Sequence, residues 1–307
     1  MFVYTGGDQV VPNDVRRVRI DKSVKIIPQR AFYGREHLID VEFHDGIEEI
    51  GKWAFGRCIL LRSVKLLGVK IIEERAFSFC GLTDVEFGVE LETIGTAAFL
   101  NCKSLRNIMM PSVTIIGYGA FSNCVQITDL ELPEGLETIE QFAFSKCERL
   151  SRIAIPLNCV IGRDDVFYNC PKLTTVDLVG GIHNTTASLH LEEWRNEMKG
   201  EINRINQVLR DTTSPQKTPI VRYWMESVTR RLDHYKAEHI LLLKEATTLL
   251  ELALWKAKIE EKEEKEFVEG MEAKRAKIDI QSKRNERRIM SGANIVIKNV
   301  LPYLELK

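Results

Sequence analysis

An Ala-Phe pair that returns at near-constant intervals is the feature of this sequence that most restricts its fold. The pair occurs seven times in the first half of the chain, with Val once in the place of Ala. Successive phenylalanines are separated by 23, 22, 22, 22, 23 and 23 residues, at Phe32, Phe55, Phe77, Phe99, Phe121, Phe144 and Phe167. A period this regular predicts stacked structural units, each burying its apolar face against the next one.

Other columns of residues keep the same phase. A cysteine stands three residues after Phe in every unit but the first, where Arg35 takes its place, and an isoleucine stands five or six residues before Phe. The pattern L-x-x-V-x-L follows each cysteine, and a further copy lies upstream at Val15, Val18 and Ile20. Its period of two predicts a strand with one buried face. Stacking the units then predicts a parallel sheet along one side of a curved rod.

The repeat as a whole reads I-G-x-x-A-F-x-x-C-x-x-L-x-x-V-x-L. Clear copies are IGKWAFGRCILLRSVKL at 50–66 and IGTAAFLNCKSLRNIMM at 94–110. This motif resembles the BspA-like class of leucine-rich repeats over roughly residues 10–180. The resemblance implies a right-handed solenoid that recognises a protein or ligand, sometimes at a cell surface. We therefore predict an α+β chain, a leucine-rich-repeat solenoid of about seven repeats followed by a C-terminal helical hairpin.

Four segments follow from this division: an N-terminal cap segment at 1–14, the solenoid at 15–180, the helical hairpin at 186–258, and a charged segment and tail at 259–307. Apolar residues at spacings of three and four predict both helices of the hairpin. Around 240–255 the second helix is apolar on more than one face, so we expect it to be buried on two sides. The first helix supplies one partner. The open end of the solenoid is the favoured second partner, and a homodimer through the C-terminal helices is the alternative.

In each L-x-x-V-x-L strand, the residues on either side of the central valine point away from the core. Three alternate repeats place a D-x-E pair there, which predicts an acidic stripe interrupted by other side chains. We take these positions as candidate contacts for a protein partner: Asp40, Glu42, Lys65, Asp84, Glu86, Met109, Asp129, Glu131, Arg152 and Asp177. The alternative is a charged surface that only keeps the sheet solvated, and the sequence leaves both open.

The cysteine column favours packing over chemistry. A small, faintly polar side chain fills a tight corner well, and stacked equivalents lie ~5 Å apart, too far for several sulfurs to bind one metal ion. No histidine joins the column, and the sequence contains no P-loop, G-x-S-x-G or H-E-x-x-H motif. We therefore expect a scaffold that binds a protein, not an enzyme, with no cofactor, no metal and no small-molecule substrate.

Charge is nearly balanced, with 43 Lys and Arg against 44 Asp and Glu, so no global field favours nucleic acid or a membrane surface. A local basic segment offers an alternative function, nuclear import or phosphate contact, through Lys274, Arg275, Lys277, Lys283, Arg284, Arg287 and Arg288. No aromatic residue interleaves with it, which argues against single-stranded nucleic acid. The first residues do not resemble a signal peptide, and no apolar run approaches the ~20 residues of a spanning helix. We expect an intracellular, cytoplasmic protein, with the nucleus as the alternative.

Overall fold

The computed structural model describes residues 1–7, 9–162, 165–179 and 192–272. The chain divides into two compact units, Met1–Arg230 and Arg231–Lys307. The first unit contains the repeats and the helix α2 together with the start of α3. The described part of the second unit is the continuation of α3.

One strand from each turn of the repeat contributes to the side of the solenoid that we call the strand face. Its strands are β1 (Phe2–Tyr4), β2 (Arg17–Ile20), β4 (Asp40–Glu42), β6 (Ser63–Leu66), β8 (Asp84–Phe87), β10 (Asn107–Met109), β12 (Asp129–Glu131), β14 (Arg152–Ile155) and β16 (Thr175–Leu178). They form three hydrogen-bonded groups, β1-β2-β4, β6-β8-β10 and β12-β14-β16, and every recorded pairing is parallel. The predicted parallel sheet is confirmed, and β1 adds a strand that the sequence did not indicate.

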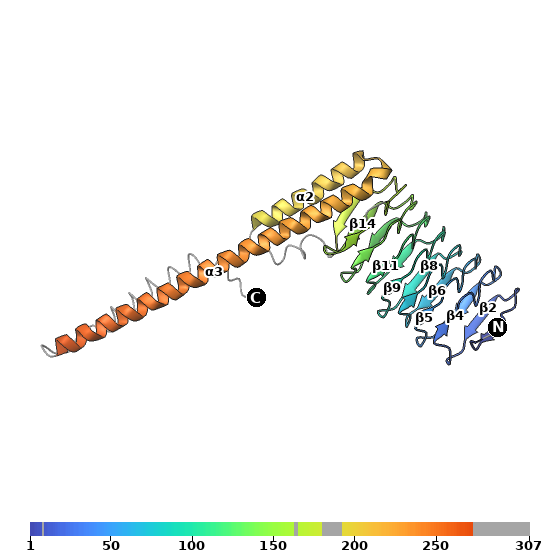
Figure 1. Ribbon diagram of the computed structural model, residues 1–307, viewed down its shortest axis with the longest axis horizontal. Helices are drawn as coiled ribbons and strands as arrows, with labels where there is room; N and C mark the ends of the chain where they lie inside the picture. Colours follow the sequence, from blue (N-terminus) through green and yellow to red (C-terminus); the bar gives the residue numbers. More distant parts are fainter. Residues whose placement is uncertain (8, 163–164, 180–191, 273–307) are drawn as a thin grey trace. The chain divides into compact units, whose positions relative to one another are not determined.

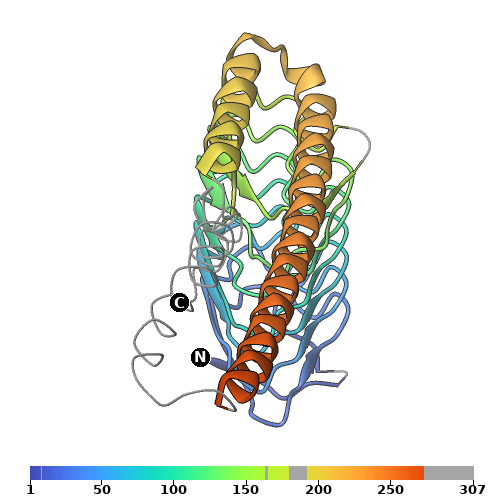
Figure 2. The same cartoon turned by 90° about the vertical axis from the view of Figure 1, so that its left-hand side faces the viewer.

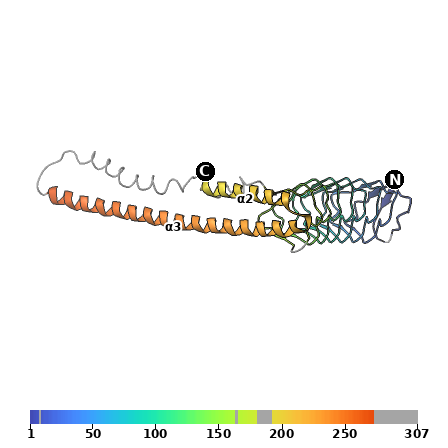
Figure 3. The ribbon, with the colours of Figure 1, turned by 90° about the horizontal axis from the view of Figure 1, so that it is seen from above.

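A second sheet, of seven two-residue strands, lines another side of the solenoid. Its strands are β3 (Ile26–Ile27), β5 (Glu49–Ile50), β7 (Ile71–Ile72), β9 (Thr93–Ile94), β11 (Ile115–Ile116), β13 (Thr138–Ile139) and β15 (Val160–Ile161). The second residue of each strand belongs to the isoleucine column and is buried. Figures 1 and 3 show the turns stacked one behind another, as the repeat period predicts.

The phenylalanine column forms the centre of the core. All seven rings are fully buried, and neighbouring rings stack nearly parallel with centroids 4.8 to 6.3 Å apart. Tyr4 from β1 extends the column at its first end, with its ring edge-on to Phe32 at 4.9 Å. Stacked rings give each repeat the same apolar neighbour on both sides, which makes the core continuous along the solenoid.

The cysteine column ties each repeat to an earlier one. Every Sγ in the column donates to the carbonyl oxygen of a phenylalanine 25 or 26 residues earlier, at 3.0 to 3.4 Å. Burial raises the pKa of the Cys102 thiol to about 12, so the group stays protonated and able to donate. In the first repeat Arg35 takes this place, and its Nε donates to the carbonyl of Val11 at 3.0 Å. The cysteines therefore act as packing groups.

The predicted helical hairpin is present as α2 (Glu192–Asp211) and α3 (Lys217–Glu272), joined through the 3-10 turn η1 (Ser214–Gln216). Figures 1 and 2 show α2 running alongside the first turns of α3. The facing apolar side chains of this first unit are buried: Met198, Ile205, Leu209, Val221, Met225 and Val228. Helix α2 also packs against β16, the last strand of the solenoid.

Hydrogen bonds from the helices satisfy the open edge of the last repeat. The Asn206 side-chain oxygen accepts from the backbone N–H of Val176 at 2.8 Å, and the Thr218 hydroxyl oxygen accepts from that of Phe167 at 2.9 Å. Lys217 is buried, and its ammonium donates to three backbone carbonyls of the last repeat. The hairpin thus supplies the polar partners that a further repeat would otherwise supply.

Within one chain, α3 is covered on one side over the described part of the second unit, and burial of its other side by a second copy stays a prediction. Leu232, Tyr235 and Ala246 lie on a covered side, whereas Leu249, which the sequence placed on the same line, is 45% exposed. Other large apolar side chains there are also exposed: Ile240, Leu241, Leu252, Leu254 and Trp255. Helix α2 spans about 30 Å and α3 about 84 Å, so α2 alone can accompany only part of α3.

Candidate partner-binding face

The outward positions of the strand face form two rows, and the parallel ladders hold them in register within each of the three hydrogen-bonded groups. The first row runs Arg17, Asp40, Ser63, Asp84, Asp129, Arg152 and Thr175. The second row runs Arg19, Glu42, Lys65, Glu86, Met109, Glu131, Ala154 and Asp177. All ten predicted contact residues therefore lie on this one face. Whether they bind a partner stays a prediction.

Ion pairs between neighbouring strands neutralise part of the acidic stripe. Lys65 Nζ lies 2.9 Å from Glu86 Oε2, and this contact raises the pKa of Lys65 above its usual value. Arg152 bridges two strands, with one nitrogen 3.0 Å from Asp129 Oδ1 and the other 3.5 Å from Asp177 Oδ2. Such pairs on a solvated surface contribute little to stability, but the two cations offset two of the three negative charges of Glu86, Asp129 and Asp177.

Four of the predicted acidic residues form no ion pair with another described residue: Asp40, Glu42, Asp84 and Glu131. Asp84 accepts a hydrogen bond from the Thr83 hydroxyl at 2.7 Å, which orients its carboxylate. These four residues are therefore the predicted acidic contacts that no cation pairs directly, and Arg17 and Arg19 lie in register beside two of them, Asp40 and Glu42.

Met109 is the large apolar side chain of this face, and it is 79% exposed. Its direct register partner is Glu86 on β8, and Glu131 takes the same repeat position on β12. An extended thioether between carboxylates gives the face an apolar centre with a charged surround, and methionine adapts readily to the shape of a partner surface.

Two features of the face differ from what the strand pattern indicated. Ala154, expected to point into solvent, is buried, and its register neighbours are Glu131 and Asp177. Arg17 and Arg19 belong to the rows but were not among the predicted contacts. The alternation around Val18 could have predicted them, since it places both arginines outward, beside Asp40 and Glu42.

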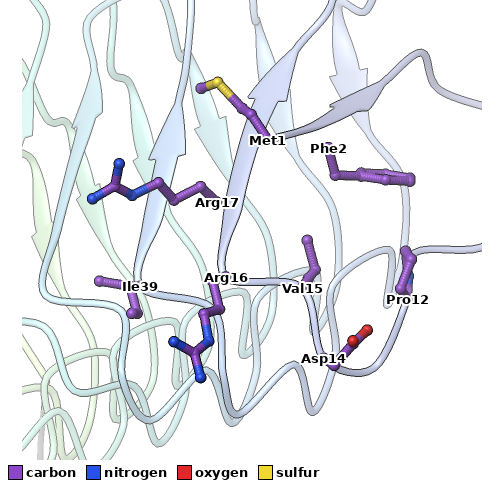
Figure 4. Close-up of a pocket in the computed structure, with 8 residues that line it drawn as sticks. All are labelled: Met1, Phe2, Pro12, Asp14, Val15, Arg16, Arg17 and Ile39. Atoms are coloured by element: carbon purple, nitrogen blue, oxygen red, sulfur yellow. The ribbon is translucent and has the colours of Figure 1, made fainter.

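A hollow of about 530 Å³ adjoins the first strands. Figure 4 shows the guanidinium groups of Arg16 and Arg17 on one side of it and the carboxylate of Asp14 on another. The remaining lining residues are Met1, Phe2, Pro12, Val15 and Ile39. Because Arg17 is also the first member of the outward rows, the hollow continues the strand face at this end of the solenoid.

The basic segment at Lys274–Arg288 lies outside the described residues, so its predicted role in import or phosphate contact stays a prediction. Within the described ranges, no three or more His, Cys, Asp and Glu side chains gather closely enough to hold a metal ion. The helices in those ranges also include none with the length and apolar character needed to span a bilayer.

Among known protein families, one family model matches this chain. The family model for the BspA type leucine rich repeat region matches residues 13–81 and 70–189, with six copies. No curated protein matches the chain.

The chain is also similar to solved structures of bacterial leucine-rich repeat proteins. A leucine-rich repeat protein of Bacteroides ovatus is 24% identical, with a TM-score of 0.47 over 54% of this chain and 55% of that one. A leucine rich cell surface protein of Faecalibacterium prausnitzii is 24% identical, with a TM-score of 0.39 over 54% and 60%. A leucine rich repeat protein of T. pallidum is 24% identical, with a TM-score of 0.39 over 52% and 68%. The matched region spans little more than half of the B. ovatus chain.

Proposed function

Because this chain belongs to the BspA-type leucine-rich-repeat family, we propose that it is a scaffold that binds a protein partner on its strand face. The observation that carries the proposal is Met109, 79% exposed at the centre of a mostly charged sheet face. Within this proposal, residues 15–180 form the recognition module, 186–258 form the helical hairpin, and the segments 1–14 and 259–307 flank them.

The composition of the face supports a protein as the ligand. Interfaces between proteins commonly combine a desolvated apolar centre with a polar rim, and a few central side chains contribute most of the affinity. Met109 supplies the centre here, and the carboxylates of Glu42, Asp84 and Glu131 supply the charged rim. A complementary partner surface would place an apolar pocket among basic side chains.

The rigidity of the face supports binding as well. Parallel ladders fix neighbouring strands about 4.8 Å apart, so the outward side chains occupy set positions before any partner arrives. A surface ordered in advance loses less conformational entropy on binding than a loop does. We place this encounter inside the cell, because all seven cysteines are free thiols and the cell interior keeps thiols reduced.

The experiment compares partner capture by the unaltered full chain with capture by two variants. In the first variant Met109→Ser removes the apolar centre. In the second, Glu42→Gln, Asp84→Asn and Glu131→Gln remove charge without breaking the Lys65 and Arg152 ion pairs. We expect both variants to lose a partner that the unaltered chain retains in quantitative affinity purification, at unchanged circular dichroism.

A matched control carries the same charge change away from the strand face. Glu36, Glu90 and Glu134 are exposed and lie outside the strands, so changing all three to glutamine should leave capture intact. If the control variant loses capture to the same extent, the loss in the strand-face charge variant comes from the change in net charge and not from its position. Unchanged capture by both strand-face variants would refute the proposal.

A further inference from the structure

The described part of the second unit exposes a line of large apolar side chains along α3. Leu241, Leu252 and Trp255 are 57%, 55% and 65% exposed, and Ile259 is 37% exposed. Leucine, isoleucine and tryptophan gathered this way on one helix are an unusual surface for a soluble chain, and such patches mark interaction sites.

Helix geometry places these residues on one side. At about 100° of rotation per residue, the four side chains fall within an arc of about 60°, and Thr248 lies within the same arc. We call Leu241, Thr248, Leu252, Trp255 and Ile259 the outer stripe. The covered side of the helix, marked by Leu232, Tyr235 and Ala246, lies opposite, at about 150°.

The spacing of the outer stripe is that of a heptad repeat. Leu241, Thr248 and Trp255 are seven residues apart and take position d, and Leu252 and Ile259 take position a. We propose that the outer stripe pairs with the outer stripe of a second copy of this chain, as a parallel two-stranded coiled coil.

The flanking charges favour a second copy in the parallel direction. Glu251 stands at position g and Lys256 at position e of the next heptad, which face each other across a parallel dimer. The attractive pair forms twice in a two-fold symmetric dimer, once on each side of the apolar core. An antiparallel dimer with full overlap of the two stripes would place Glu251 opposite Glu251 of the other copy. It would also place Lys244 opposite Lys258 of the other copy, and both of these contacts are repulsive.

Both charged residues are available for this pairing. Glu251 and Lys256 are exposed, and neither forms an ion pair with a described residue of its own chain. Glu245 also occupies a position a, and Thr248 interrupts the apolar line. Polar residues at core positions weaken a coiled coil while fixing its register, so the dimer should form and dissociate with protein concentration.

The first test measures the mass of the full chain over a range of concentrations by sedimentation velocity. We expect a monomer–dimer equilibrium that the double variant Leu252→Ser, Trp255→Ser shifts to monomer. Ile240 and Leu254 are equally exposed but lie off the stripe, so the control Ile240→Ser, Leu254→Ser should still dimerise. A monomeric unaltered chain at every concentration, or equal loss in the control, overturns the proposal.

The second test exchanges charges. Glu251→Lys alone and Lys256→Glu alone each turn both attractive pairs into repulsive ones, so each should associate roughly tenfold more weakly than the unaltered chain. Mixed together, the two variants restore opposite charges in a parallel heterodimer, and we expect association to recover. A mixture that stays monomeric, or single variants that dimerise normally, contradicts parallel pairing.

A third test removes residues 273–307. If the shortened chain dimerises while the full chain does not, that segment covers the outer stripe instead of a second copy, and the proposal is overturned.

Discussion

The hydroxyl oxygen of Thr218 accepts a hydrogen bond from the backbone N–H of Phe167 at 2.9 Å, on the open edge of the last repeat. Each earlier phenylalanine of the column donates the same N–H to the carbonyl that precedes the phenylalanine of the next repeat. Phe144, for example, donates to Val166 at 3.1 Å. Thr218 therefore takes the place of a backbone carbonyl from a further repeat.

Replacing Thr218 by the nearly isosteric valine should leave the buried N–H of Phe167 without an acceptor. An unsatisfied buried donor costs about 1–3 kcal/mol, and the loss should be localised at the last repeat. Urea unfolding measures the stability, and hydrogen exchange of the Phe167 amide measures the local opening. Thr247→Val on an exposed turn of α3 is the control. Unchanged exchange at Phe167 would show that water can replace the hydroxyl.

The Lys217 ammonium should contribute to the same cap. It donates to the carbonyls of Leu173, Pro171 and Cys170 at 2.6, 2.9 and 3.3 Å, and burial lowers its pKa below the usual value. Lys217→Met keeps the apolar stem but removes all three donors. We expect a loss of about 1.5–3 kcal/mol in the free energy of unfolding, because the carbonyls lose charge-assisted bonds. Thermal unfolding at pH 7 tests this, and an equally stable variant would mean that desolvation of the charge offsets its hydrogen bonds.

Periodicity explains why so much of the solenoid could be predicted from its sequence. The Phe99 column repeats in every unit and the Cys102 column in every unit but the first, so nearly the same geometry has to satisfy all copies. The cap has no such repetition. Asn206 and Thr218 are single polar residues on helices, and their role depends on where the chain returns in space. Nothing in the local sequence marks them.

The sequence predicted which residues lie on the candidate face but not which of them pair with each other. Alternation placed its residues on one side, but the pairing of Lys65 with Glu86, 21 positions apart, depends on strand register. For the second side of α3, the sequence predicted an apolar surface but not what covers it. The sequence correctly indicated two apolar sides, but composition does not say whether a chain contains a partner for each.

The middle of the phenylalanine column should be the most sensitive part of the core. Phe99 stacks between Phe77 and Phe121, with centroids 5.3 and 5.2 Å away. Phe99→Ala should lower stability by about 3–5 kcal/mol, since it creates a cavity between two rings that the backbone ladder holds in place. Phe79 is 40% exposed, so Phe79→Ala serves as the control and should cost far less. Similar losses from both variants in denaturant unfolding would contradict a rigid stacked core.

The cysteine column should make the fold sensitive to alkaline pH. Burial raises the pKa of Cys102 from 9.0 to about 12. An unfolded chain loses this proton near pH 9, while the folded chain keeps it, so between these values the folded state binds more protons and stability falls as pH rises. Below pH 9 the thiol contributes no pH dependence.

Each such thiol should steepen the decline by at most about 1.4 kcal/mol per pH unit. Lysines and tyrosines also titrate in this range, so the measurement compares the unaltered chain with Cys102→Ala at pH 8 to 10.5. The variant should be less stable at pH 8 but should lose less stability on going to pH 10.5. Identical slopes would mean that the folded thiolate is stabilised within the column. Rapid reaction of the native thiols with a disulfide reagent at pH 8 would instead show that the column is accessible to solvent.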